Sequence, residues 1–305
     1  MKILLTGGSG MVGNNFLEYS KALDAEVFSP SSKELDLLNY TEVNDYITYY
    51  KPECVIHAAG TVGGIQANIS NPVKFLYNNM EMGFNVIKAA ETNKINKLIN
   101  LGSSCMYPKY AKNPLNEEQI LTGALEPTNE GYAIAKIACA KLCEYIDNED
   151  RELFYKTVIP CNLYGRYDSF SKEKSHMIPS VINKLHEAKI KSMPSVDIWG
   201  DGSARREFMY AGDLADFLMM AIERIEHVPQ YLNVGLGEDY SVNEYYEAIA
   251  NVVGFKGKFE HDLEKPTGMK QKLVDIAKLN KFGWQAKTSL LEGLKKTYEF
   301  YLNGK

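Results

Sequence analysis

A glycine-rich turn within the first thirteen residues constrains the fold of this chain more than any other feature. The segment Gly7-Gly8-Ser9-Gly10-Met11-Val12-Gly13 follows a short apolar stretch, Ile3–Thr6, and opens a helical pattern from Met11 to about Leu23. Its glycines satisfy both G-x-x-G-x-x-G and G-x-G-x-x-G. Because glycine has no Cβ, the backbone N–H groups of such a turn can approach a pyrophosphate at the helix N-terminus. The strand–turn–helix context therefore predicts a dinucleotide-binding domain.

Strand-like and helix-like segments alternate through the first half of the chain. After Ile3–Thr6, the strand patterns are Glu26–Phe28, Glu53–Ala59, Lys97–Leu101 and Lys156–Ile159. The helical patterns that follow the first helix are Glu42–Tyr50, Lys74–Asn93 and Gly131–Asp147. Such alternation favours a parallel sheet covered on both faces, with right-handed crossovers. The expected fold class is therefore α/β, with a doubly wound parallel (Rossmann) sheet.

The regularity weakens after about Asn162, where loops rich in Gly, Ser and Pro separate the helical patterns at 178–188, 213–225 and 242–253. We predict a Rossmann domain over residues 1–162 and a smaller α/β C-terminal substrate lobe over residues 163–305. The helical segment 213–225 and a strand at 231–234 are candidates to return to the first domain. The substrate is expected to bind in a cleft between the two parts.

Composition excludes several classes of function. The 305-residue chain carries 34 Lys and Arg against 39 Asp and Glu, a net charge of −5 with no basic run, so no nucleic-acid partner is expected. No apolar run approaches the roughly 20 residues that cross a bilayer, and no signal peptide is visible. The five cysteines, of which Cys139 and Cys143 lie four apart without a neighbouring His, are expected to be reduced structural thiols. We therefore expect a cytoplasmic protein without a metal site.

A tyrosine and a lysine define the candidate catalytic helix. Tyr132 and Lys136 are four residues apart, which places them on one face of the helical pattern Gly131–Asp147. The nearby ammonium and a bound nicotinamide cation are expected to lower the phenol pKa from its usual value of about 10. The Ser103 hydroxyl follows the strand Lys97–Leu101 and is expected to polarise the same carbonyl oxygen. Together these residues predict proton transfer to a carbonyl group.

These motifs resemble the extended short-chain dehydrogenase/reductase family, and within it the GDP-L-fucose synthase (GDP-4-keto-6-deoxymannose epimerase/reductase) subgroup. The first matching segments are GMVG at 10–13, AAGTVGGIQAN at 58–68 and LGSSCMYPK at 101–109. They continue with LEPTNEGYAIAKIACAKLCE at 125–144, PCNLYG at 160–165, SHMIP at 175–179 and WGDGSARREF at 199–208. The resemblance runs from residue 3 to about residue 298, which is nearly the whole chain.

The resemblance implies an NADPH-dependent oxidoreductase with an isomerase step, acting in polysaccharide biosynthesis. Members of the subgroup take a GDP-linked 4-keto-6-deoxy sugar, invert C3 and C5, and reduce the C4 ketone. By this likeness Ser103 and Tyr132 bind the C4 oxygen, Tyr132 donates the proton, and Lys136 supports Tyr132 and the cofactor ribose. Cys105 and His176 correspond to the acid–base pair of the epimerisation. The family also implies a homodimer.

The same resemblance implies which residues hold the two ligands. For the cofactor they are Gly7, Gly10, Met11, Val12, Gly13, Asp36, Leu37, Ala58, Leu101, Lys136, Pro160, Asn162, Leu163 and His176. For the nucleotide sugar they are Asn162, Lys184, Trp199 and Arg206.

The cofactor region departs from the family pattern. Ser9 replaces an arginine of the glycine turn, and the residues from Pro30 to Ser32 replace an arginine expected after the second strand. No acid that would hold the ribose of NAD precedes Glu34, whereas the serines and Lys33 suit a 2′-phosphate. We therefore expect NADP(H), with NAD(H) left open.

The sugar region departs as well. The family's K-P-D-G appears as Lys265-Pro266-Thr267-Gly268, and Arg166, Tyr167 and Arg205 change loops expected to border the pyranose. These changes raise an alternative, C4 reduction of a GDP-6-deoxy-4-keto-heptose without epimerisation. A nucleotide-sugar 4-epimerase or a non-catalytic dinucleotide sensor fits the motifs less well, because Cys105, His176 and the Tyr132–Lys136 pair are all present.

Overall fold

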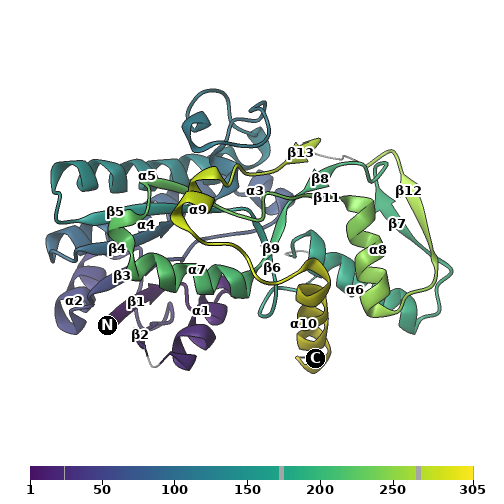
Figure 1. The fold of residues 1–305 in the computed structure, drawn as a ribbon, viewed down its shortest axis with the longest axis horizontal. Coiled ribbons are helices and arrows are strands. Elements are labelled where there is room, and N and C mark those ends of the chain that lie inside the picture. The colour runs from purple at the N-terminus through teal and green to yellow at the C-terminus, as the bar shows by residue number, and fades with distance from the viewer. Residues whose placement is uncertain (24, 172–174, 266–268, 305) are drawn as a thin grey trace.

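The computed structural model describes residues 1–23, 25–171, 175–265 and 269–304. Its centre is a six-stranded sheet in the order β10-β5-β4-β3-β1-β2, with every neighbouring pair parallel (Figure 1). The strands are β1 (Lys2–Thr6), β2 (Glu26–Phe28), β3 (Cys54–His57), β4 (Lys97–Leu101), β5 (Phe154–Pro160) and β10 (Tyr231–Val234). This confirms the predicted doubly wound α/β fold.

Helices cover both faces of this sheet, as Figure 1 shows. One face carries α1 (Met11–Ala22) and α7 (Ala211–Glu223), and the other carries α2 (Tyr40–Tyr50), α4 (Pro72–Thr92) and α5 (Glu130–Glu149). Strand β1 illustrates why both faces are apolar: Ile3 and Leu5 belong to the first core and Leu4 to the second. Successive side chains of a strand point to opposite faces, so its apolar run builds both cores at once.

A smaller lobe lies beyond the carboxyl edge of the sheet (Figure 1). Its helices are α6 (Met177–Ile190), α8 (Val242–Val253) and α10 (Leu290–Asn303), which share a core of their own. Three small sheets accompany them: β7 (Ser195–Trp199) with β12 (Lys258–Asp262), β6 (Asn162–Tyr164) with β9 (Phe208–Tyr210), and β11 (Tyr240–Ser241) with β8 (Arg205–Arg206) and β13 (Gln271–Lys272). A short helix α9 (Ala277–Phe282) packs back toward β10.

The chain crosses between the two parts more than once. Helix α7 and strand β10 come after the first lobe elements in sequence, yet both lie with the six-stranded sheet. The short helix α3 (Ile65–Ser70) and the small sheets of the lobe had no clear signal in the sequence. The sequence-based division at residue 162 stays a prediction. Within the described ranges, no helix is long and apolar enough to cross a membrane.

Candidate active site

Among the glycines of the turn, Gly10 is the one with open space beside it, whereas Gly7, Gly8 and Gly13 are packed against other atoms. Gly7 has a φ of +79°, and a Cβ there would lie 2.6 Å from the backbone nitrogen of Ala59. A Cβ on Gly13 would lie 2.3 Å from the Gly7 carbonyl oxygen. A Cβ on Gly10 would meet only that carbonyl, at 3.4 Å, and Gly10 precedes α1 without a capping side chain. The first N–H groups of α1, at Met11 and Val12, are thus suited to a pyrophosphate.

The other predicted cofactor residues lie mostly along the same edge of the sheet. Ala58 follows β3, Leu101 ends β4, and Pro160 ends β5, which are adjacent parallel strands. Asn162 and Leu163 belong to β6, just beyond that edge. This is where ligands bind in open parallel sheets, so these residues fit a dinucleotide extended along the edge.

Two predicted cofactor residues come from the loop after β2. The Asp36 carboxylate accepts a hydrogen bond from the Leu38 backbone nitrogen at 3.0 Å, and the Leu37 carbonyl accepts one from Asn85 at 2.9 Å. Ser29, which directly follows β2, lies so close to the glycine turn that a Cβ on Gly8 would overlap its hydroxyl. The loop is therefore placed against the turn by local hydrogen bonds and close packing.

Four predicted catalytic residues meet at the carboxyl end of β4. Ser103 precedes the 3₁₀ turn Ser104–Met106, and its hydroxyl oxygen lies 3.4 Å from the Cys105 backbone nitrogen, which donates to it. The Ser103 side chain also hydrogen-bonds the Tyr132 phenol and the Cys105 thiol. Lys136 is 6% exposed, and its ammonium donates to the Leu101 carbonyl at 2.8 Å and lies 5.8 Å from the Tyr132 ring centroid.

The direction of the Tyr132 pKa differs from the sequence-based expectation. Burial raises the pKa of the phenol, although its hydrogen bond with Ser103 opposes this effect. Burial also lowers the pKa of Lys136, whose ammonium is directed to the Leu101 carbonyl. Desolvation is the largest cause of both shifts, because it disfavours the charged form of each group. The expected lowering by Lys136 is therefore wrong for this structure, and Tyr132 is a protonated donor at neutral pH.

Cys105 and His176 occupy different parts of the site. Cys105 is 7% exposed, and burial raises the pKa of its thiol. His176 precedes the first residue of α6 in the lobe; its side chain reaches solvent, while the surrounding protein lowers its pKa. No hydrogen bond or ion pair joins His176 to Ser103, Cys105 or Tyr132 in the described ranges, and burial alone shifts its pKa. Cys105 is thus presented from the end of the central sheet, and His176 from the lobe.

The predicted sugar-binding residues come from the lobe, and most already have protein partners. The Asn162 amide donates to the Glu207 carbonyl at 2.9 Å, and the Lys184 ammonium lies 2.8 Å from the Asp197 carboxylate. Trp199, at the end of β7, is 57% exposed. Arg206 is partly buried, its guanidinium donates to the Arg205 carbonyl at 2.7 Å, and desolvation lowers its pKa.

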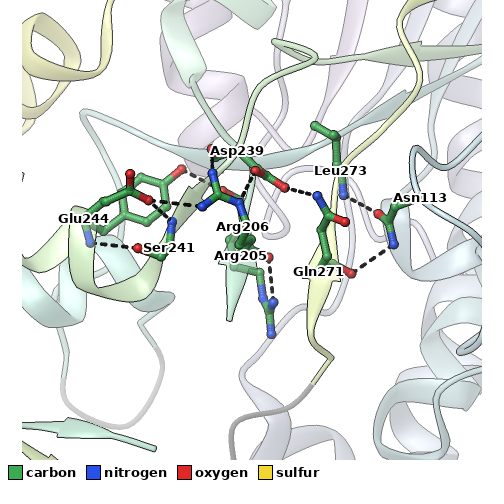
Figure 2. Close-up of polar contacts among 9 residues, drawn as sticks. Asn113, Arg205, Arg206, Asp239, Ser241, Glu244, Gln271 and Leu273 are labelled. Carbon is green, nitrogen blue, oxygen red and sulfur yellow. Dashed lines mark hydrogen bonds and ion pairs between the residues drawn. The ribbon is translucent and has the colours of Figure 1, made fainter. Parts of the chain in front are cut away.

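The arginines that depart from the family pattern are paired within the protein. Arg166 forms an ion pair with Glu18 of α1 at 2.6 Å and donates to the Tyr210 hydroxyl at 3.1 Å. Arg205 forms one with Asp239, also at 2.6 Å (Figure 2). The expectation that their loops border the pyranose stays a prediction. Pro266, Thr267 and Gly268 lie outside the described residues.

One charged residue near the site was missed by the sequence reasoning. The Lys272 ammonium interacts electrostatically with Cys105 and Arg206, although Lys272 belongs to no motif. Its strand, β13, has two residues and pairs with a strand far away in the sequence, so only the tertiary fold brings it here. In the described ranges, no group of three or more His, Cys, Asp or Glu residues could hold a metal ion.

Comparison with known proteins places the chain among nucleotide-sugar enzymes. Residues 3–235 match the model of the NAD dependent epimerase/dehydratase family. A GDP-L-colitose synthase from Yersinia pseudotuberculosis is 57% identical over 305 residues, covering 100% of this chain and 99% of the relative. A GDP-L-fucose synthase from Azorhizobium caulinodans is 47% identical, covering 99% and 97%.

A solved structure extends the likeness to three dimensions. The GDP-mannoheptose C4 reductase from Campylobacter jejuni, with NADP bound, is 32% identical with a TM-score of 0.90, covering 99% of this chain and 98% of that one. The chain belongs to the NAD dependent epimerase/dehydratase family. It is an oxidoreductase of the extended short-chain dehydrogenase/reductase type, as the sequence predicted.

Proposed function

We propose that this enzyme reduces the C4 ketone of a GDP-4-keto-6-deoxy sugar with NADPH, after epimerisation at C3 and C5. The observation that carries this proposal is the double role of Ser103, whose side chain hydrogen-bonds both Tyr132 and Cys105. A ketone oxygen held by Ser103 and Tyr132 would bring a neighbouring carbon toward the Cys105 thiol. One oxygen-binding site can therefore serve both half-reactions.

In the reduction, the chain supplies the proton and the orientation. When bound, the cofactor supplies a hydride to C4. Tyr132, protonated because it is buried, donates its proton to the C4 oxygen as charge develops there. Ser103 donates a hydrogen bond to the same oxygen, and Lys136, fixed on the Leu101 carbonyl, provides a positive charge beneath the phenol.

In the epimerisation, the protons at C3 and C5 are acidic because both carbons flank the C4 ketone. Cys105 as thiolate removes a proton from one face, and the resulting enolate is stabilised at the C4 oxygen by Ser103 and Tyr132. His176, presented by the lobe, returns a proton to the other face. In free side chains the pKa of a cysteine thiol is about 8.5 and that of a histidine imidazole about 6.5, so the two values lie on either side of neutrality.

The lobe holds the nucleotide sugar in this proposal. Trp199 offers an exposed ring for packing on a base or a sugar. Lys184 and Arg206 carry positive charges suited to the diphosphate, and Asn162 lies between the lobe and the cofactor edge. Ser29, Ser31 and Lys33, after β2, are suited to the 2′-phosphate of NADP(H).

We further propose a homodimer in the cytoplasm. Helices α4 and α5 pack on each other and leave Val73, Tyr77, Ile134 and Tyr145 exposed, a surface that a second copy would cover. The five cysteines are free and buried, with no disulfide, which is typical of a reducing compartment.

The identity of the Yersinia relative supports a second candidate substrate. That protein is named for GDP-L-colitose, a sugar that lacks the C3 hydroxyl of L-fucose, and it is 57% identical over the whole chain. A colitose-type substrate would be epimerised at C5 only. The heptose alternative is supported by the Campylobacter reductase, which is 32% identical to this chain. The relatives named for hexose products are 57% and 47% identical, and these higher identities favour a hexose substrate.

The test supplies GDP-4-keto-6-deoxymannose and its 3-deoxy counterpart in heavy water, with NADPH oxidation followed at 340 nm. With GDP-4-keto-6-deoxymannose we expect NADPH oxidation and deuterium at C3 and C5 of the product. If the enzyme prefers the 3-deoxy substrate, we expect faster NADPH oxidation with that substrate and deuterium at C5 of its product. Cys105→Ser and His176→Gln should each lower deuterium incorporation about 100-fold or more. His227→Gln, at an exposed histidine far from the site, is the matched control.

The outcomes separate the candidates. Oxidation without deuterium would leave a plain C4 reductase and contradict the epimerase part. No oxidation of either hexose, with turnover of a GDP-4-keto-6-deoxy-heptose, would establish the heptose alternative.

A further inference from the structure

Glu207, which lies between β8 and β9, has a completely buried carboxylate that is bonded to backbone N–H groups. One of its oxygens accepts hydrogen bonds from the Leu236 and Gly237 backbone nitrogens, at 2.6 and 2.9 Å. The other accepts from the Val274 backbone nitrogen at 2.9 Å. Hydrogen bonds to an ionised acceptor are stronger than those to a neutral one, and a buried carboxylate is costly without them. These bonds therefore fix the side chain to two other segments of the chain.

The two segments belong to different parts of the fold. Leu236 and Gly237 follow β10, the edge strand of the six-stranded sheet, whereas Val274 follows β13 in a small sheet of the lobe. Glu207 itself connects β8 of that small sheet to the β6–β9 pair, which lies where the central sheet meets the lobe (Figure 1). Gly235 makes room for the carboxylate, because a Cβ there would lie 2.4 Å from the Glu207 Oε1 atom. One side chain thus joins the end of the central sheet to two small sheets.

The main chain of Glu207 holds the side chain of Asn162. The Asn162 amide donates to the Glu207 carbonyl at 2.9 Å, and Asn162 pairs with Phe208, the next residue, in the β6–β9 ladder. The residue before it, Cys161, donates from its backbone nitrogen to the carbonyl of Val234, the last residue of β10, at 2.9 Å. A displacement of Glu207 would therefore move the acceptor that sets the direction of the Asn162 side chain.

A second buried glutamate holds β10 without reaching Asn162. Glu117 accepts from the Asn233 backbone nitrogen at 2.9 Å and lies 3.4 Å from the Lys278 ammonium. It is 5% exposed, and Glu207 is 0% exposed. Within the described ranges, no hydrogen bond or ion pair joins Glu117 to Asn162. The two carboxylates are therefore alike in burial and in their bonds to β10 or the residues after it, but differ in their connection to the site.

We propose that Glu207 is a positioning residue: its carboxylate fixes the main-chain carbonyl that orients Asn162, and thereby strengthens the binding of the ligands of Asn162. The place of Asn162 between the cofactor edge and the lobe rests on the proposed function. Glu207 has no exposed surface with which to touch the cofactor or the sugar, so it acts through the hydrogen bond at Asn162.

Glu207→Gln in the full-length enzyme tests this role. The glutamine amide keeps the size of the side chain but must place its NH₂ group against at least one of the backbone N–H donors. Well below the unfolding temperature, we expect the Kd of NADPH, from fluorescence titration, to rise about 5- to 10-fold, as on loss of a buried hydrogen bond. Glu117→Gln, the matched control, should lower Tm to a similar extent and leave this Kd within about twofold of the wild type.

A second variant displaces the carboxylate without changing it. In Gly235→Ala the added methyl group would overlap Oε1 of Glu207, so the Kd of NADPH should rise as in Glu207→Gln. Gly123→Ala is its control, because a Cβ there would meet only Pro108, at 3.4 Å.

A double-mutant cycle with Asn162→Ala identifies the route. If Glu207 acts through Asn162, Glu207→Gln should change the Kd of NADPH by less than about twofold once residue 162 is alanine. KM for the GDP-sugar should follow the same pattern, with kcat within about twofold of the wild type. Wild-type Kd and KM in Glu207→Gln or in Asn162→Ala overturn the proposal, as does a full effect of Glu207→Gln in the Asn162→Ala background. If the NADPH results hold but the wild type oxidises no NADPH with any GDP-4-keto sugar, Glu207 keeps its role and the proposed function fails.

Discussion

The two sides of the candidate site differ in how their functional groups are held. On the sheet side, Ser103, Tyr132 and Lys136 are joined by hydrogen bonds and close packing, and Lys136 is almost completely buried. On the lobe side, His176 and Trp199 are exposed and come from a helix terminus and a two-stranded sheet. The comparison indicates that the protein itself fixes Ser103, Tyr132 and Lys136, whereas the side chains of His176 and Trp199 are left open to solvent and to a ligand.

The largest effect is expected on the sheet side. Tyr132→Phe removes the proton donor and should lower kcat for ketone reduction by about 10²- to 10⁴-fold. NADPH affinity, measured by fluorescence titration, should stay within about twofold of the wild type, because the glycine turn is untouched. Tyr145→Phe, the same change at an exposed position of the same helix, is the control. More than a tenth of wild-type kcat in Tyr132→Phe would mean that another group donates the proton.

The sheet side was also the part most readable from the sequence. The alternation of strands and helices predicted the sheet, and the four-residue spacing of Tyr132 and Lys136 placed them on one helix face, because both depend on local periodicity. The position of Ser103 at the end of a strand predicted that it meets them. The pKa direction of Tyr132 was wrong because burial is a property of the tertiary fold. Lys272 was missed for the same reason: the pairing of β13 with β8 joins distant segments without any motif.

Substitutions on the lobe side should have smaller effects, and these should appear in KM for the GDP-sugar rather than in kcat. Trp199→Ala removes an exposed ring that we expect to pack on the GDP-sugar, so KM for that substrate should rise about 2- to 10-fold. The rate at saturating substrate should not change, because Trp199 lies outside the group around Ser103. Met193→Ala, at an exposed residue shortly before β7, serves as control. A fall in kcat without a rise in KM would contradict the division between the two sides.

The smallest effect is expected from Asp168, in the loop that leads from β6 toward His176. One carboxylate oxygen accepts a hydrogen bond from the Ser169 backbone nitrogen at 2.8 Å, and the other is buried without a partner among the described residues. Burial raises the pKa of Asp168 from 3.8 to about 6. A folded-state pKa above the unfolded one means that the stabilising contribution is complete below about pH 3.8 and is lost as the pH rises through about 6.

Asp168→Asn keeps the hydrogen-bond acceptor for Ser169 and removes the charge, so it should flatten this part of the pH dependence. We expect Tm of the variant, relative to the wild type, to rise by about 1–3 °C between pH 5 and pH 7.5 in thermal unfolding followed by circular dichroism. Asp45→Asn, at an exposed position of α2, should show no such rise. A Tm difference that is the same at every pH would mean that the Asp168 carboxylate is solvated in the folded protein. The Asp168 side chain would then resemble the exposed groups of the lobe side, with solvent rather than burial setting the pH dependence of its contribution.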